Sequence, residues 1–232
     1  MQKYLKMEIP YIKQKNKKGN RMCGPASMAM VLRSFNQNGF QNNLWKEIKE
    51  PDSHGSFYGK THKMCLSFLN RGFYSVCLTV VNPILFLRLC QEHSVRVILG
   101  HRQSKRSELA HFTVFKEITN NMVIVNDSEL GSNRGEKREI PHADFLELMG
   151  GNIEVPKNLC VLVSDSISSL NQSQCPTCSL PIIEMVNCGQ CGNKVPLQPT
   201  VILGCQNSDC QDKAIETVIC PHCDADFQLG ND

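Results

Sequence analysis

The sequence of 232 residues lacks the features that mark membrane and secreted proteins. No stretch approaches the roughly 20 apolar residues that a membrane-spanning helix requires. The N-terminal segment MQKYLKMEIPYIKQKNKKGN is basic, but it contains neither the apolar core nor the cleavage site of a secretory signal. We therefore expect a cytoplasmic protein that makes no use of a membrane.

The cysteines lack the pattern of a disulfide framework. Their number, 13, is odd, and no secretion signal accompanies them. Five stand singly, at positions 23, 65, 77, 90 and 160, whereas the other eight fall between positions 175 and 223. Such crowding at short spacing indicates metal binding rather than disulfide bonds.

The last part of the chain also has few cations. Residues 171–232 hold 2 Lys+Arg and 7 Asp+Glu, a net 2 − 7 = −5, whereas residues 1–170 hold 23 and 15, a net 23 − 15 = +8. The polar stretch SDSISSLNQSQ lies near this change in charge. We predict a first unit at 1–163, a linker at 164–174 and a second unit at 175–232.

Apolar periodicity predicts an α+β class for the first unit, with helices preceding an antiparallel sheet. Met28, Val31, Leu32 and Phe35 recur at helical spacing after Cys23. Further helices are expected at 61–73, 82–94 and 140–151. Strands are expected at 74–80, 95–101, 111–118, 122–127 and 158–164, the third and fourth forming a hairpin around Thr-Asn-Asn.

The stretch RMCGPASMAMVL predicts a reactive cysteine. Proline is favoured in the first turn of a helix, so Pro25 places Cys23 at a helix N-terminus. Unpaired N–H groups and the positive end of the helix dipole stabilise a thiolate there. The other lone cysteines lie in apolar patterns and are expected to be core residues.

A cysteine nucleophile needs a base, and the base needs a group that orients it. His111 opens the strand HFTVF, and Asp127 shares its parity across the expected hairpin, so both side chains are expected on one face. Asn126 is an alternative orienter, but its parity places it on the other face. His54, His62, His93 and His101 fall in loops or near helix ends without such a partner. The backbone N–H of Cys23 and the side chain of Gln14 are candidate oxyanion donors.

The order Gln…Cys-Gly-Pro-Ala…His-Phe…Asp resembles that of papain-fold cysteine peptidases, most closely the bacteriocin-processing (double-glycine leader) peptidase family. The resemblance covers most of residues 8–163 and is carried by IPYIKQ, CGPASMAMVL and HFTVFKEITNNMVIVNDSELG. It implies a papain-like fold in which Cys23 is the nucleophile, His111 the base, Asp127 the orienter and Gln14 an oxyanion-hole residue. It also implies cleavage after small residues such as Gly-Gly. The basic insertion KNKKGN and Ser128 differ from the family pattern.

The tail contains four cysteine pairs in two similar halves, CPTCSLPIIEMVNCGQC and CQNSDCQDKAIETVICPHC. Pairs at this spacing present two thiolates to one ion, and two pairs complete the four-cysteine shell of structural zinc. We predict two zinc ions in a tandem zinc-ribbon domain. We call each cysteine pair a knuckle. We expect consecutive knuckles to share one ion. An interleaved arrangement is the alternative, and His222 could replace a neighbouring cysteine. The ligands are Cys175, Cys178, Cys188, Cys191, Cys205, Cys210, Cys220 and Cys223.

These features predict a cysteine peptidase that acts on a peptide or protein and uses the zinc ribbons to dock a substrate or protein partner. Two alternatives share the same residues: a papain-fold acyl or peptidyl transferase, and a catalytically inactive protein-binding module. Nucleic acid is a disfavoured partner, because the tail is acidic and carries only Lys194 and Lys213 as cations.

Overall fold

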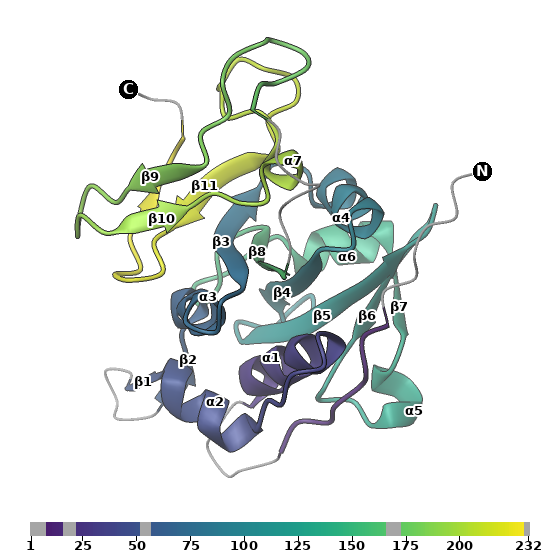
Figure 1. Ribbon diagram of the computed structural model, residues 1–232. Coiled ribbons are helices and arrows are strands. Elements are labelled where there is room, and N and C mark those ends of the chain that lie inside the picture. The colour runs from purple at the N-terminus through teal and green to yellow at the C-terminus, as the bar shows by residue number, and fades with distance from the viewer. Residues whose placement is uncertain (1–7, 16–21, 52–56, 166–172, 230–232) are drawn as a thin grey trace.

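The computed structural model describes residues 8–15, 22–51, 57–165 and 173–229 (Figure 1). The helices are α1 Cys23–Ser34, α2 Gln41–Ile48, α3 Thr61–Leu69, α4 Pro83–Glu92, α5 Ser132–Gly135, α6 His142–Leu148 and α7 Thr200–Leu203. The strands are β1 Lys49–Pro51, β2 Phe57–Gly59, β3 Tyr74–Val80, β4 Arg96–Arg102, β5 Ala110–Ile118, β6 Met122–Asn126, β7 Arg138–Pro141, β8 Leu159–Ser164, β9 Met185–Asn187, β10 Lys194–Pro196, β11 Ile215–Ile219 and β12 Asp226–Phe227. Almost all of the predicted loop KNKKGN, His54 and most of the predicted linker lie outside the described residues.

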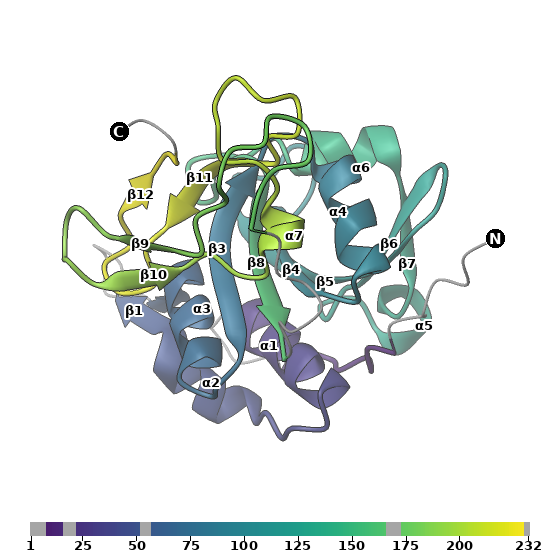
Figure 2. The ribbon, with the colours of Figure 1, turned by 45° about the horizontal axis from the view of Figure 1, so that its top comes forward.

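An eight-stranded antiparallel sheet in the order β12-β11-β3-β8-β4-β5-β6-β7 organises the molecule. Helices α1, α2 and α3 pack together on one face, and α4 and α6 lie on the other (Figures 1 and 2). The central strands are buried on both faces for this reason; β8, for example, is buried at every residue. The predicted α+β class is confirmed.

Local signals in the sequence account for several of these boundaries. Pro25 lies in the first turn of α1, and every residue of α1 from Cys23 to Leu32 is buried. The predicted cap Asn82 accepts hydrogen bonds from the backbone N–H groups of Ile84 and Leu85, at 3.1 and 3.2 Å, and so starts α4. Gly72 follows α3 with a φ of +81°, a conformation that favours glycine.

The hairpin of β5 and β6 contains an irregularity that sequence parity does not reveal. Near the turn, Ile118 pairs with Val123, and this register alone would place Asp127 on the face opposite to His111. The register shifts between Phe115 and Glu117, so that Val114 pairs with Asn126. Continued one step, the shifted register sets Asp127 beside Thr113, diagonal to His111 and on the same face.

The tail shares the sheet and the core of the preceding residues. Strand β11 pairs with β3 in the antiparallel direction, and β12 pairs with β11 (Figure 2). Apolar tail residues, among them Leu203 and Val218, belong to the same buried cluster as α1 and β5. The segment predicted as a second unit, 175–232, is therefore joined to the first by strand pairing as well as by the chain.

The helices of the molecule lack membrane-spanning character in the part of the chain that the structure describes. Among the described residues, none combines the length and the apolar character that crossing a membrane requires.

Candidate active site

Cys23 is the first residue of α1. Its side chain interacts with His111, which lies on strand β5. Cys23 is 6% exposed. One turn later, the buried Ser27 hydroxyl donates a hydrogen bond of 3.2 Å to the carbonyl of Phe112, which ties α1 to β5. A Cβ at Gly24 would lie 2.6 Å from Cε of Met64, so the absence of a side chain here lets Met64 of α3 pack closely against α1.

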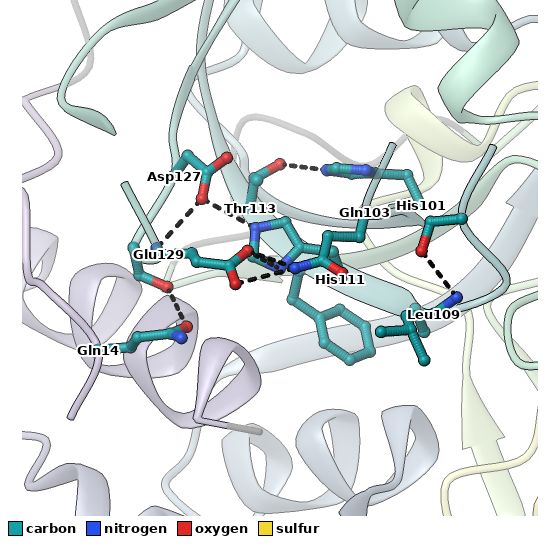
Figure 3. Close-up of polar contacts among 12 residues, drawn as sticks. Gln14, His101, Gln103, Leu109, His111, Thr113, Asp127 and Glu129 are labelled. Carbon is teal, nitrogen blue, oxygen red and sulfur yellow. Dashed lines mark hydrogen bonds and ion pairs between the residues drawn. The ribbon is translucent and has the colours of Figure 1, made fainter. Parts of the chain in front are cut away.

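His111 is the second residue of β5 and is 3% exposed. Its Nε2 lies 2.8 Å from Oδ1 of Asp127 (Figure 3). Burial acts to lower the pKa of His111, but the hydrogen bonds and charges of Asp127 and Cys23 outweigh it and raise the pKa to about 10. The raised pKa favours the cationic imidazolium, with the Asp127 carboxylate at Nε2, Oε2 of Glu129 3.9 Å from Nδ1 and the Cys23 side chain beside the ring.

Asp127 receives donors at both carboxylate oxygens. In addition to His111, Arg138 Nη1 donates to Oδ2 at 2.7 Å, and the backbone N–H of Glu129 donates to Oδ1 at 3.2 Å. Burial opposes ionisation, yet these donors hold the pKa of Asp127 well below its usual range. Asn126, the alternative orienter, is used elsewhere: its side chain donates to the carbonyl of Ile9 at 3.0 Å and accepts from the backbone N–H of Lys137 at 3.2 Å.

Sequence reasoning missed the residues that support this pair. Arg138 comes from β7, and no local pattern marked it. His101 ends the strand expected at 95–101, and the expectation that it has no partner is wrong: it lies in β4 directly opposite His111, with the two ring centroids 5.5 Å apart (Figure 3). The pairing of the two strands was the signal that could have found it.

His101 is a neutral member of the cluster. Burial and the positive charge of His111 lower the pKa of His101 to about 4. Its Nδ1 lies 2.7 Å from the carbonyl of Arg102, which only accepts, so Nδ1 carries the proton. Its Nε2 therefore accepts from the Thr113 hydroxyl at 3.1 Å. The ring packs edge-to-face against His111 without competing for its proton.

Gln14 lies beside the loop that follows Asp127. Its backbone N–H donates to the carbonyl of Ser128 at 2.9 Å, and its side-chain oxygen accepts from the Ser128 hydroxyl at 3.3 Å (Figure 3). The amide of Gln41 spans the neighbouring residues, accepting from the N–H of Lys15 and donating to the carbonyl of Lys13, both at 2.9 Å. These contacts hold Gln14 in place, and its role in an oxyanion hole stays a prediction.

A cleft of about 910 Å³ lies beside the nucleophile. Cys23 and Gly24 line it together with Ala110 and Phe112, the two residues that flank His111. The cleft therefore reaches Cys23 and the strand that carries His111.

The eight tail cysteines form two sets of four, and the preference for consecutive pairing is wrong. Cys175 and Cys178 gather with Cys205 and Cys210, whereas Cys188 and Cys191 gather with Cys220 and Cys223. We call these sets metal site A and metal site B. The cause is the extended chain between knuckles. Strand β9 separates the first knuckle from the second, and β11 separates the third from the fourth. Because the chain turns back through β10, antiparallel to β9, the third knuckle returns to the first and the fourth meets the second.

The geometry of both sets fits a tetrahedral ion. The closest sulfur pairs are 3.4 and 3.7 Å apart in site A and 3.6 and 3.7 Å apart in site B. Zinc–sulfur bonds of about 2.3 Å in a tetrahedron separate sulfurs by about 3.8 Å. Four sulfur ligands close the shell, so an ion here supplies structure and countercharge rather than a catalytic position. His222 is absent from both sets among the described residues.

Residues 6–77 match the model of the Peptidase_C39 like family. Among solved structures, a C39-like peptidase from Bacillus anthracis is 16% identical, with a TM-score of 0.54 over 69% of this chain and 96% of its own. The peptidase domain of Streptococcus ComA, a bifunctional ABC transporter involved in quorum sensing, is 16% identical, with a TM-score of 0.48 over 67% and 98%. A double glycine motif protease from an AMS/PCAT transporter, solved with its leader peptide, is 18% identical, with a TM-score of 0.47 over 68% and 92%. No curated protein matches the sequence.

The similarity to the Bacillus anthracis protein shows a shared fold, and nearly a third of this chain lies outside it. The family match covers α1 with Cys23 and ends within β3. Together they show similarity to the C39-like peptidases over residues 6–77 and a fold shared with one of them. The predicted papain-like arrangement of helices on an antiparallel sheet is confirmed.

Proposed function

We propose that the chain cleaves a peptide or protein through an acyl-thioester on Cys23, with His111 as acid and base and Asp127 as the orienting group. The observation that carries the proposal is the buried series in which Asp127 holds Nε2 of His111 at 2.8 Å while the ring interacts with the Cys23 sulfur. The raised pKa of His111, between Asp127 and Cys23, supports a thiolate–imidazolium pair, the resting form that a thiol peptidase needs.

In the first half-reaction, the thiolate attacks the scissile carbonyl carbon, the carbon–sulfur bond forms and the negative charge moves to the carbonyl oxygen. The backbone N–H of Cys23, at the start of α1, is one donor to that oxygen. Gln14 is the proposed second donor, through its amide nitrogen, because its side-chain oxygen already accepts from the Ser128 hydroxyl. His111 then gives its proton to the leaving amine as the carbon–nitrogen bond breaks.

In the second half-reaction, His111 accepts a proton from water as the water oxygen attacks the thioester. Collapse of this intermediate breaks the carbon–sulfur bond, releases a carboxylic acid and restores the sulfur–imidazole pair. If an amine replaced the water, the product would be an adduct instead. The mass of the acyl product therefore separates hydrolysis from acyl or peptidyl transfer.

The proposed substrate is a peptide with small residues before the scissile bond, Gly-Gly being the model that the family resemblance implies. Recruitment of that substrate or of a protein partner through the tail is also part of the proposal. The lone, unpaired cysteines agree with action in the reducing cytoplasm.

The decisive experiment compares new N-termini in a cell extract treated with wild-type protein or with Cys23→Ala. We expect a set of new N-termini that depends on Cys23 and is also lost in His111→Gln. His93→Gln, at the C-terminal cap of α4 and outside the site, is the matched control and should retain the full set. Equal N-termini with wild type and Cys23→Ala would refute the peptidase and leave the binding module as the explanation.

A further inference from the structure

The cleft beside Cys23 is walled in part by the metal-binding tail. One part of its lining is the segment Phe57–Thr61, which comprises β2 and the approach to α3. Another part comes from the tail itself: Thr217 and Ile219 of β11, and Asp224 and Asp226 beyond the last metal knuckle. The Bacillus anthracis structure covers 69% of this chain. The cleft thus includes a wall built from residues outside the predicted catalytic unit.

Strand pairing holds the β11 part of this wall. Thr217 Oγ1 lies 2.7 Å from Thr79 Oγ1 of β3, and the backbone N–H of Thr217 donates to the same oxygen at 3.2 Å. Both threonines line the cleft. This part of the wall depends on the sheet rather than on a metal ion.

The knuckle of Cys220 and Cys223 holds the next part of the wall. The backbone N–H of Cys220 donates to the carbonyl of Ala225 at 2.8 Å, and that of Asp224 donates to the carbonyl of Cys220 at 3.1 Å. Asp224 has a φ of +66°, so the tight turn directs its backbone immediately after the metal ligand Cys223. Gathering of Cys220 and Cys223 around one ion therefore fixes where the Asp224 side chain points.

Asp224 reaches across the cleft wall to residues far away in the sequence. Its Oδ2 lies 2.7 Å from Nζ of Lys60, and its Oδ1 lies 2.9 Å from Nδ1 of His62. Lys60 is anchored in turn, since its backbone N–H donates to the carbonyl of Ile48 at 2.9 Å.

We propose that metal site B positions one wall of the substrate cleft, and that Asp224 is the positioning residue that fixes this wall against the segment Phe57–Thr61. The inference rests on the proposed function only in naming the cleft as the substrate site. An ion in site B holds the knuckle, the knuckle sets Asp224, and Asp224 holds Lys60 and His62 at the start of α3. A peptide bound beside Cys23 then meets a wall whose position depends on the ion.

Site A is the internal control for this inference. Among the described residues no metal-site cysteine lines the cleft, but the lining residues Ile219 and Asp224 directly adjoin ligands of site B, whereas no lining residue adjoins a ligand of site A. The cysteines of site A form a small buried cluster of their own, whereas Cys188, Cys220 and Cys223 of site B contact the main core. Loss of an ion from site A should leave the cleft wall in place.

Hydrogen exchange of the full-length, zinc-loaded chain tests the coupling without reference to peptidase activity. Each of the double variants Cys188→Ser/Cys191→Ser and Cys175→Ser/Cys178→Ser should bind one zinc ion fewer by elemental analysis. Peptides covering 57–64 should exchange at least about threefold faster in the site B variant and at the wild-type rate in the site A variant. Equal behaviour of the two variants at 57–64 would overturn the proposal.

The variant Asp224→Asn keeps all eight ligands and isolates the positioning residue. We expect unchanged zinc content, faster exchange at 57–64, and a KM for a peptide substrate raised about three- to fivefold with kcat preserved, the size expected for a partly exposed ion pair. Asp224→Glu should recover part of the KM change. The matched control is Asp209→Asn, an exposed acid beside Cys210 of site A, which should alter neither value.

The two arms distinguish the failure of this proposal from the failure of the proposed function. Normal exchange and normal KM in Asp224→Asn would refute the positioning role while leaving the peptidase intact. Faster exchange at 57–64 in a protein that cleaves nothing would keep the coupling and remove the peptidase.

Discussion

Cysteine occurs in three environments in this molecule, and the source of the compensating charge distinguishes them. Cys23 lies beside the cation His111, which Asp127 holds in place. The tail cysteines face one another in fours, and only an added cation can balance them. The remaining four have no such partner and lie in the core: Cys65, Cys77, Cys90 and Cys160.

The comparison shows that burial alone makes a thiol inert. Desolvation raises the pKa of Cys65 to about 12 and raises the pKa values of Cys77, Cys90 and Cys160 above the ordinary thiol value. Cys23 is buried to a similar degree, at 6% exposure, but has an internal cation next to it. The proposed reactivity of Cys23 therefore rests on the neighbour of its sulfur rather than on the exposure of the sulfur.

Removal of metal should have the largest effect on these three environments, because it takes away the positive charge that balances the tail cysteines. Structural zinc contributes on the order of 10–16 kcal/mol to the folding of zinc-finger peptides. With a strong chelator, we expect amides at 173–182 and 204–213, around site A, to lose protection in hydrogen exchange, whereas β4 and β5 keep theirs. Zinc added back should restore the protection. Full protection around site A in metal-free protein would show that the tail needs no ion.

Removal of the internal partners should abolish turnover. Cys23→Ala and His111→Gln are each expected to lower kcat/KM by at least about 10⁴-fold, because loss of one member disables the unit. The double variant should be no worse than either single variant. Cys90→Ala, at a core cysteine without a cation, is the contrasting change and should lower stability while leaving kcat/KM per folded molecule unchanged. Additive losses in the double variant would argue that the two residues act separately.

Removal of the orienting charge should move the pH profile. Asp127 contributes to raising the pKa of His111 from 6.5 to about 10, so the alkaline limb of kcat/KM is expected near the higher value in the wild type. In Asp127→Asn the limb should move down toward 6.5, with a loss of about 10²- to 10⁴-fold in rate. Adding Asn126→Asp to this variant should restore neither the limb nor the rate, because residue 126 lies on the other face of the hairpin. An unmoved alkaline limb would assign that ionisation to another group.

The smallest effect is expected at the outer edge of the cluster. Arg138→Gln removes one donor to Asp127 from a side chain that is 30% exposed, so we expect a loss of about 1 kcal/mol in the free energy of unfolding. The lowered pKa of Asp127 contributes stability above pH 3.8, and this contribution is lost as the pH falls. The raised pKa of His111 contributes below pH 6.5 and is lost as the pH rises through about 10.

Urea unfolding of the wild type and of Arg138→Gln across this pH range measures the stability that is lost at the acid end and at the alkaline end. The difference between the two proteins should shrink at low pH, where Asp127 is protonated. A difference that stays constant with pH would mean that Arg138 stabilises the fold by packing alone.

Local patterns carried most of what could be predicted from the sequence. Pro25 marked the start of α1, Asn82 capped α4, and the hairpin parity selected Asp127 over Asn126. The parity argument selected the correct residue because of a register shift between Phe115 and Glu117. Without that shift, the register next to the turn would place Asp127 on the face opposite to His111. Such a shift leaves no mark in the pattern of apolar residues.

What could not be predicted depends on contacts between distant segments. Arg138 and His101 join the site through strand neighbours, and the helix α2 at Gln41–Ile48 was not expected at all. Knuckle pairing was ambiguous because every cysteine pair has nearly the same spacing. Only the antiparallel return of the tail decides which pairs meet.

The pairing of β11 with β3 has a consequence for any shortened form of this protein. A chain that ended at residue 163 would leave β3, buried at six of its seven positions, as the outermost strand of the sheet. An uncovered apolar strand with open N–H and C=O groups is a template for intermolecular pairing. The tail therefore caps an aggregation-prone border, and a form cut before residue 175 should precipitate rather than remain a smaller working enzyme.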